Sequence, residues 1–427
     1  MDISILTIIY FLAWLLTFLF FIRKNKKKEV GAYTVIVVSY VVYAFFSILY
    51  YGAAPELFEH ITFFPFLYLY ILLMIALLPV RQYDTFKVKG FIGVNRAVCY
   101  MVFSIFLITT LIVIPSTITQ LQESFFILLT EDDGAIQLYN EMHAQDTSNS
   151  YLNGGIIGIC TVIRYLLYEI CVFLFFYYLT FPRKNLILIL LLLLSFFIDI
   201  LISFAKGGRT VSTMEAFTIL MTYLIFERYL GDSVNRATRK VLLVLGGGVV
   251  MLTLVVTISR SLNREGGAGE GIIEYVGQAN LLFNEEAFDS NNLRDGDRTC
   301  NVFKRLLGFD NVPKSITGVR DKHASIKLSD RNFSTFIGDF VLDFGPFATA
   351  LIIMLFTFVF LSMTRPRRGV LHLEQLLLIQ LVADICMHGG MYLFYYSFSG
   401  NYILMMYVLF AIVLKMSSNG VLIQARQ

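Results

Sequence analysis

Repeated apolar runs of about 20 residues most constrain how this chain can fold. A run of this length crosses the hydrocarbon core of a bilayer as an α-helix, because a helix satisfies its own backbone hydrogen bonds where water is absent. Only 15% of the 427 residues are charged and 57% are hydrophobic, whereas a soluble domain has about 25% charged residues. The sequence therefore predicts an all-α polytopic integral membrane protein.

The apolar runs predict about eleven transmembrane helices in a single transmembrane domain over residues 1–427. The expected spans are 4–22, 32–51, 61–80, 91–114, 156–181, 186–204, 210–226, 241–258, 338–362, 370–388 and 402–416.

The distribution of Lys and Arg predicts the orientation of these spans. One side carries most of the basic loops, and the loops 52–60 and 115–155 on the other side contain no Lys or Arg. The basic side is expected to be cytoplasmic, which places the amino terminus outside, the carboxyl terminus in the cytoplasm, and the 115–155 and 259–337 loops outside. The basic segments are Arg23–Lys28, Arg81–Lys89, Arg183–Lys184, Arg228–Lys240 and Arg365–Arg368.

A short polar hinge, Lys206-Gly207-Gly208-Arg209, separates two of the apolar runs on the predicted outer side. Two adjacent glycines allow a tight turn and leave space for a ligand near the backbone. Lys206 and Arg209 are outward-facing cations in a region where the other short loops have none. We interpret the hinge as half of an anion-binding site.

The 259–337 loop carries the other outward-facing cations and is expected to cap the site. Arg260 and Arg264 directly follow a span and are four residues apart, so a continuing helix would place both on one face at the membrane boundary. With Arg209, they could grip a diphosphate bidentately. Within this loop, 272–283 and 302–307 are candidates for short amphipathic helices on the membrane surface.

Ionisable residues inside the spans gather toward the predicted outer side. Helical rise places Arg164 about 12 Å, Asp199 and Glu215 about 9 Å, and Asp343 about 8 Å below the outer ends of their helices. Arg164 and Asp199 are predicted to pair, because they lie at similar depth on consecutive antiparallel helices. Because these ionisable residues lie mostly toward the outer side, they predict a polar cavity that opens outward.

The five His and five Cys residues show no metal-ligand spacing, so we expect no metal and no cofactor, and nothing suggests a nucleic-acid partner. His323 in the large loop is a candidate acid or base.

The order of these features resembles the Wzy-type oligosaccharide repeat-unit polymerases and, more distantly, the O-antigen ligases. The similarity covers about residues 186–360: the Gly-Gly-Arg-Thr hinge, a span ending in external arginines, a large external loop, then Asn332-Phe333-Ser334-Thr335-Phe336 and Asp343-Phe344-Gly345. In the ligases a histidine precedes the asparagine. Here Arg331 occupies that position, which favours a polymerase.

The resemblance implies a GT-C-like fold in the bacterial inner membrane. It also implies glycosyl transfer from a polyprenyl-diphosphate donor, such as an undecaprenyl-diphosphate-linked oligosaccharide, to a second lipid-linked repeat unit, with a possible chain-length regulator as partner. Arginines would stabilise the departing diphosphate without a metal, and a carboxylate or histidine would deprotonate the acceptor hydroxyl. The expected catalytic residues are Arg209, Arg260, Arg264, Glu215, Asp343 and His323, and the expected substrate-binding residues are Lys206, Gly207, Gly208, Arg331, Asn332 and Asp339, with Asp339 also a candidate base.

Two alternatives remain from the sequence. One is a ligase-like transferase that attaches glycan to another acceptor. The other is a transporter for an anionic or lipid-linked substrate, although such a protein would more often centre its polar groups at the midplane of the bilayer.

Overall fold

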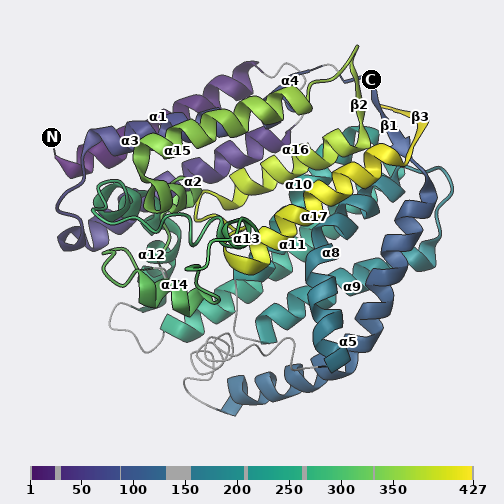
Figure 1. Ribbon diagram of the computed structural model, residues 1–427, viewed down its shortest axis with the longest axis horizontal. Coiled ribbons are helices and arrows are strands. Elements are labelled where there is room, and N and C mark those ends of the chain that lie inside the picture. The colour runs from purple at the N-terminus through teal and green to yellow at the C-terminus, as the bar shows by residue number, and fades with distance from the viewer. Residues whose placement is uncertain are drawn as a thin grey trace. The chain divides into compact units, whose positions relative to one another are not determined.

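Long apolar helices form most of the structure (Figure 1), as the apolar runs predict. The computed structural model describes residues 2–24, 30–86, 88–130, 155–205, 210–261, 267–329 and 332–425. Each of the eleven predicted spans contains a helix. Among the described residues, six helices are long and apolar enough to cross a membrane, and a bent pair would make a seventh. The protein is therefore an α-helical multi-pass membrane protein.

The bent pair replaces the single span expected over 61–80. Helices α3 (Phe63–Ala76) and α4 (Leu78–Thr85) meet at Leu77 with a bend of 46°. Pro79 lies in the first turn of α4. Proline has no backbone N–H and its ring clashes with the preceding turn, so it is tolerated at a helix start but breaks a continuous helix.

The chain divides into two compact units, and unit 1 comprises residues 1–88, 269–371 and 378–405. Its remaining elements are α1 (Ile3–Lys24), α2 (Ala32–Ala53), the 3₁₀ turn Pro55–Leu57, α12 (Gly267–Leu282), the π-helical turn Phe283–Ala287, α13 (Asn301–Leu306), α14 (Ile316–Lys322), α15 (Thr335–Met363), β2 (Val370–His372), most of α16 (Leu373–His388) and the start of α17 (Ser397–Met416).

Helices α1, α2, α3 and α15 lie side by side in unit 1 (Figure 1). Trp14 on α1 is fully buried between the rings of Tyr40 and Tyr70, whose centroids lie 4.8 and 4.9 Å from its own. Edge-on aromatic pairs of this kind add to the free energy of burial.

The helix predicted at 272–283 is present as α12, whose later turns pack against α2. The hydroxyl of Ser47 on α2 donates to the Gly277 carbonyl at 2.8 Å and accepts from the Asn280 amide at 3.1 Å. A Cβ on Gly277 would lie 2.4 Å from the Phe46 carbonyl oxygen, so this close approach requires glycine. The predicted helix at 302–307 is present as α13.

Helix α15 is broken at Gly345, whose backbone has φ 78° and ψ 164°. This conformation is left-handed and extended, which glycine adopts readily, and Pro346 then restarts the helix. The Tyr68 hydroxyl on α3 donates to the Pro346 carbonyl at 2.5 Å. The break therefore separates a short first segment, which carries Asp339 and Asp343, from the long apolar remainder.

Unit 2 comprises residues 89–268, 372–377 and 406–427. Its strands β1 (Gly90–Val94) and β3 (Ser418–Gln424) pair antiparallel, with Phe91 opposite Ile423. The predicted span 91–114 therefore begins with a strand instead of a helix. The apolar run does not predict this strand, because its partner β3 is remote in sequence. The other elements are α5 (Arg96–Thr130), α8 (Gly155–Leu179), α9 (Leu186–Ala205), α10 (Thr210–Phe226), the 3₁₀ turn Glu227–Tyr229, α11 (Asp232–Ser261) and the end of α17.

Candidate functional site

Most of the basic residues expected in the site lie outside the described residues. These are Lys206 and Arg209 of the hinge, together with Arg264 and Arg331, and the hinge residues Gly207 and Gly208 also lie outside. Arg260 belongs to the last turn of α11, but its side chain is outside the described part of the chain. The remaining candidates lie in one group in unit 2 and in two clusters and a loop segment in unit 1.

The group in unit 2 is built around Arg164 on α8, which is buried with 3% of its side chain exposed. Its Nη2 donates to Oδ1 of Asp199 on α9 at 2.6 Å. The predicted pair is therefore confirmed. The Arg164 guanidinium also lies over the ring of Phe106, 5.3 Å from its centroid. Such a pair keeps a charged residue tolerable among apolar helices.

Glu215 on α10 lies within electrostatic range of this pair and of a further carboxylate, Glu169 on α8. We call Arg164, Glu169, Asp199 and Glu215 the inner carboxylate group. It has one guanidinium for three carboxylates. Within the described structure, Oε2 of Glu215 and Oδ2 of Asp199 are buried and have no hydrogen-bond partner. A buried polar atom left unpaired is costly and usually has a functional reason.

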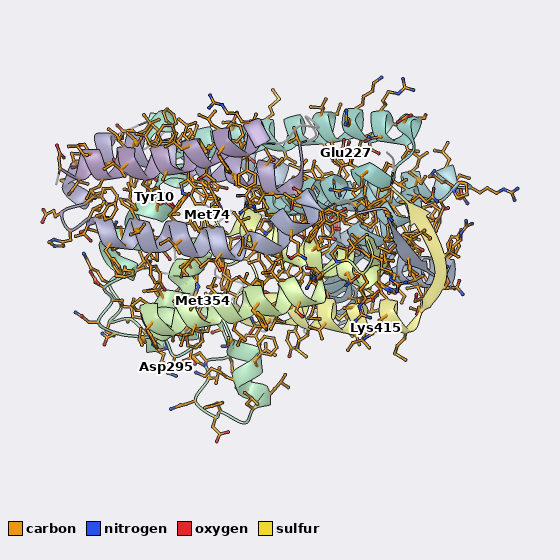
Figure 2. The ribbon with its side chains drawn as sticks, turned by 90° about the horizontal axis from the view of Figure 1, so that it is seen from above. Tyr10, Met74, Glu227, Asp295, Met354 and Lys415 are labelled. Carbon is orange, nitrogen blue, oxygen red and sulfur yellow. The ribbon has the colours of Figure 1, made fainter. Side chains whose placement is uncertain are left out.

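The group in unit 1 begins with a turn in the large loop, Arg294-Asp295-Gly296-Asp297. The Asp297 N–H donates to the Arg294 carbonyl at 2.9 Å, and Asp295 and Gly296 have φ values of 53° and 80°. Two positive φ values characterise a type I′ turn, for which Asp-Gly is a preferred pair. The turn lies beside the first half of α15, where Asp295 is labelled in Figure 2.

Arg294 and Arg298 reach from this turn to two aspartates on α15. Arg294 Nε lies 2.8 Å from Oδ1 of Asp343, and its Nη2 lies 3.7 Å from Oδ1 of Asp339. Arg298 Nε lies 3.2 Å from the same Asp339 oxygen. All four side chains are at most 7% exposed. We call these four residues the cap anchor, because they join the large loop to α15.

The second oxygens of the two aspartates are also bound. The backbone N–H and the hydroxyl of Thr299 both donate to Oδ2 of Asp343 at 2.7 Å. The Leu393 N–H donates to Oδ2 of Asp339 at 2.8 Å. Buried ions need such partners, and Oδ1 of Asp343 meets Arg294 Nε as an ion pair without hydrogen-bond geometry. The arrangement suits a fixed structural joint better than a base that must accept a proton.

His323 lies in a third cluster, around the fully buried carboxylate of Asp297. His323 Nε2 lies 3.0 Å and Lys322 Nζ 2.7 Å from Oδ2 of Asp297, and Lys304 binds Oδ1. Burial raises the pKa of Asp297, but the hydrogen bonds from Lys304, Lys322 and His323 lower it more, so the pKa lies below its ordinary value. Asp297 therefore joins the turn to α13 and α14.

The segment Asn332–Phe336 forms the entry to α15. Asn332 is exposed, and its N–H donates to the Ser329 carbonyl at 2.9 Å. The Phe333 ring stacks on Tyr392 with centroids 5.3 Å apart. Thr335 has a φ of 67°, and its N–H donates to the Met391 carbonyl at 2.8 Å. These contacts fix the backbone where the large loop enters α15.

The sequence patterns do not single out Arg294, Arg298 and Asp297, because acids and bases nearly balance in the large loop and charges in such a loop are most often solvated. Two signals could have found them. Asp295-Gly296 predicts a tight turn, and the spacing of four between Arg294 and Arg298 matches that between Asp339 and Asp343.

The fold and the buried charges define the class: an α-helical multi-pass membrane protein with ionisable residues on its helices. Comparison of the chain with protein-family models, curated proteins and solved structures found no match. Across the described residues, no group of three or more His, Cys, Asp and Glu side chains is arranged to hold a metal ion.

Proposed function

We propose that the protein is a polymerase that joins lipid-linked oligosaccharide repeat units into a surface polysaccharide. It would act at the outer face of the bacterial inner membrane, with eleven spans and a GT-C-like arrangement. The donor is a glycan on polyprenyl diphosphate. The acceptor hydroxyl oxygen bonds to the donor's anomeric carbon, the carbon–oxygen bond to the diphosphate breaks, and the diphosphate leaves with the electron pair.

The observation that carries this proposal is the unpaired oxygen of Glu215 in the inner carboxylate group. Glu215 follows Arg209 by six residues, which corresponds to about 9 Å of helical rise from the hinge. A carboxylate oxygen without a hydrogen-bond donor of its own is available to accept the proton of a substrate hydroxyl. Among the four candidate bases, Asp339, Asp343 and His323 are instead held in ion pairs.

The arginines would act on the leaving diphosphate. Negative charge builds on the diphosphate as it leaves, and fixed guanidiniums stabilise this charge better than water does, because they are already oriented. We assign this role to Arg209, Arg260 and Arg264, with Lys206 and Arg331 as reserves. The cap anchor holds residues 294–298 of the large loop against α15.

The test is the gel ladder of surface polysaccharide from a strain that lacks the gene. The proposal expects single repeat units on the outer lipid and no long chains. Polymer that accumulates on the polyprenyl carrier would instead indicate a ligase. A ladder of normal length would show that the proposal is wrong.

A reconstituted assay addresses the transporter alternative. The purified protein is placed in liposomes and supplied with a polyprenyl-diphosphate-linked oligosaccharide. It should extend the glycan in the absence of any transport protein. Movement of the substrate across the bilayer without elongation would contradict the proposal.

A further inference from the structure

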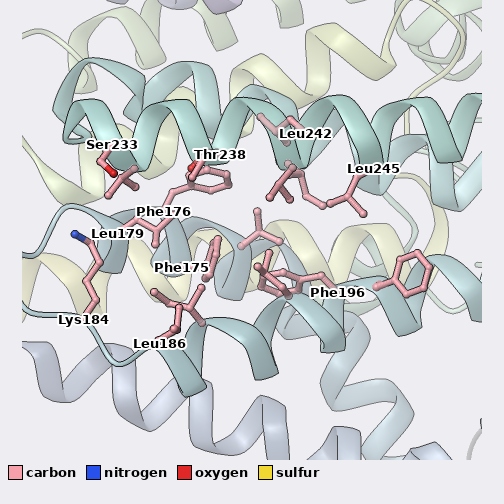
Figure 3. Close-up of a pocket in the computed structure, with 18 of the residues that line it drawn as sticks. Phe175, Phe176, Leu179, Lys184, Leu186, Phe196, Ser233, Thr238, Leu242 and Leu245 are labelled. Carbon is pink, nitrogen blue, oxygen red and sulfur yellow. The ribbon is translucent and has the colours of Figure 1, made fainter.

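An apolar cavity of about 370 Å³ lies within unit 2, between α11 on one side and α8 and α9 on the other (Figure 3). Phe175, Phe176 and Phe196 line one wall and Leu242 and Leu245 the other. A volume of this size falls in the range of small-molecule binding pockets. Few polar groups reach the cavity, so its occupant must be largely hydrocarbon.

The few polar groups gather at one end. Lys184, in the connection between α8 and α9, directs its ammonium group toward this end, where the hydroxyls of Ser233 and Thr238 on α11 also lie (Figure 3). Within the described residues, no hydrogen bond or ion pair holds the Lys184 ammonium. Burial lowers the pKa of Lys184, so an anion at this end would relieve an unfavourable burial of charge.

The opposite end of the cavity is closed. Ile200 on α9 and Val249 on α11 are buried against each other, with Ala216 of α10 packed beside them. From Leu186 to Ile200, α9 rises about 21 Å, which exceeds half of the roughly 30 Å hydrocarbon core. The lining residues of the cavity therefore extend over more than the thickness of one leaflet, with Lys184 at one end.

The helices beside the cavity also present apolar side chains outward. Leu190 and Leu194 on α9 are 57% and 54% exposed, and Val244 on α11 is 75% exposed. Apolar residues so exposed on a membrane helix are suited to contact lipid. The surroundings of the cavity thus match those of a lipid site.

We propose that this cavity binds an anionic phospholipid, with one acyl chain between α9 and α11 and the phosphate at Lys184, Ser233 and Thr238. The charge of the neighbouring loops supports an anionic head group: Arg183 precedes Lys184, and Arg236 and Lys240 lie on the first turns of α11. Basic pockets between membrane helices bind anionic head groups in this way. The site belongs to the basic side of the protein and does not depend on the proposed polymerase reaction.

The test is lipid retention. The full-length protein is reconstituted in vesicles of equal parts phosphatidylglycerol and phosphatidylcholine, extracted in mild detergent, and weighed by native mass spectrometry. We expect one retained phosphatidylglycerol in preference to phosphatidylcholine. Lys184→Gln should reduce that preference about fivefold, the contribution of one basic residue near an anionic surface. Leu242→Trp, which fills the cavity, should remove the retained lipid.

Matched controls separate the cavity from the rest of the surface. Arg23→Gln removes an exposed charge on α1, outside the cavity lining, and Leu243→Trp adds the same indole at a side chain 77% exposed and also outside that lining. Both should retain lipid as the unmodified protein does. If Leu242→Trp does not fold, Ile189→Phe fills the same cavity. Equal retention in the cavity-filling variant and the unmodified protein, or an unchanged lipid preference in Lys184→Gln, would overturn the proposal.

Discussion

Arg294 in the large loop and Asp343 on α15 form an ion pair with 2.8 Å between Nε and Oδ1, and Asp343 is fully buried. The two residues are remote in sequence and meet only because the Asp295-Gly296 turn directs the loop back to the helix. Two charges removed from water stabilise a fold only weakly as a pair, but removing one of them leaves the other buried and unpaired. The pair therefore makes the attachment of the loop to α15 sensitive to a single substitution.

Arg294→Ala should release the large loop from α15. The substitution leaves Asp343 without its guanidinium partner and weakens the pairing of Asp339. Removing one partner of a buried ion pair lowers the stability by about 3–5 kcal/mol. The measurement is the midpoint of thermal unfolding in detergent, together with the rate of proteolysis within residues 269–329. Arg305→Ala, at an exposed arginine of α13, is the control. An unchanged proteolysis rate in Arg294→Ala would contradict the anchoring role.

The Asp297 cluster predicts a pH dependence of the same loop. The pKa of Asp297 is below its ordinary value in the folded protein. A carboxyl of this kind contributes stability above its unfolded pKa of about 3.9 and loses that stability as the pH falls through the folded pKa. Proteolysis of the loop should therefore be slow and constant between pH 5 and 7 and should accelerate below the unfolded pKa. Proteolysis of the loop in Asp297→Asn should be faster at pH 7 than in the unmodified protein. The variant should also lose the acceleration in acid that depends on this carboxyl.

Gly277→Ala should destabilise the packing of α12 against α2. Its Cβ would lie 2.4 Å from a backbone oxygen of Phe46, which cannot move without shifting α2. Overpacking of this kind costs about 1–3 kcal/mol. The control is Gly269→Ala in the same helix, where nothing lies within 4 Å, and alanine there should stabilise by up to about 1 kcal/mol. Thermal unfolding of both variants distinguishes a contact effect from a change in helix propensity.

The sequence predicts well those features that are local or that follow from the thickness of the bilayer. Apolar runs locate the helices, and helical rise places Arg164 and Asp199 at similar depths, so their pairing follows without a structure. The ends of the spans are less predictable, because β1 replaces the start of one span by pairing with β3 near the other end of the chain. No local pattern specifies such a partner.

The cap anchor could not be derived from composition, because charges in a loop of balanced sign are most often solvated. Its four residues become recognisable only when the turn at Asp295-Gly296 brings Arg294 and Arg298 over the Asp339–Asp343 face of α15. These contacts also bear on which candidate residues suit a catalytic role. The resemblance implies catalytic roles for Asp343 and His323, and both lie in ion pairs.

Glu215→Gln tests the base directly. The amide keeps the size of the side chain but cannot accept a proton, so elongation should fall by about 100-fold or more. The readout is the length distribution of surface polysaccharide at matched protein levels. Glu270→Gln, an exposed carboxylate on α12, is the control and should leave the distribution unchanged. Normal chain lengths in Glu215→Gln would remove this residue from the reaction.

Arg209 provides the test of the leaving-group site. Arg209→Ala should abolish long polysaccharide while membrane insertion and protein level stay unchanged, because the diphosphate loses a preorganised positive charge. Arg209→Lys restores the charge but offers a single ammonium in place of the planar fork that binds two phosphate oxygens at once, so it should remain strongly impaired. Arg236→Lys, on the basic side of the protein, should have normal chain lengths. Full activity in Arg209→Lys would show that charge alone matters, and full activity in Arg209→Ala would place the diphosphate elsewhere.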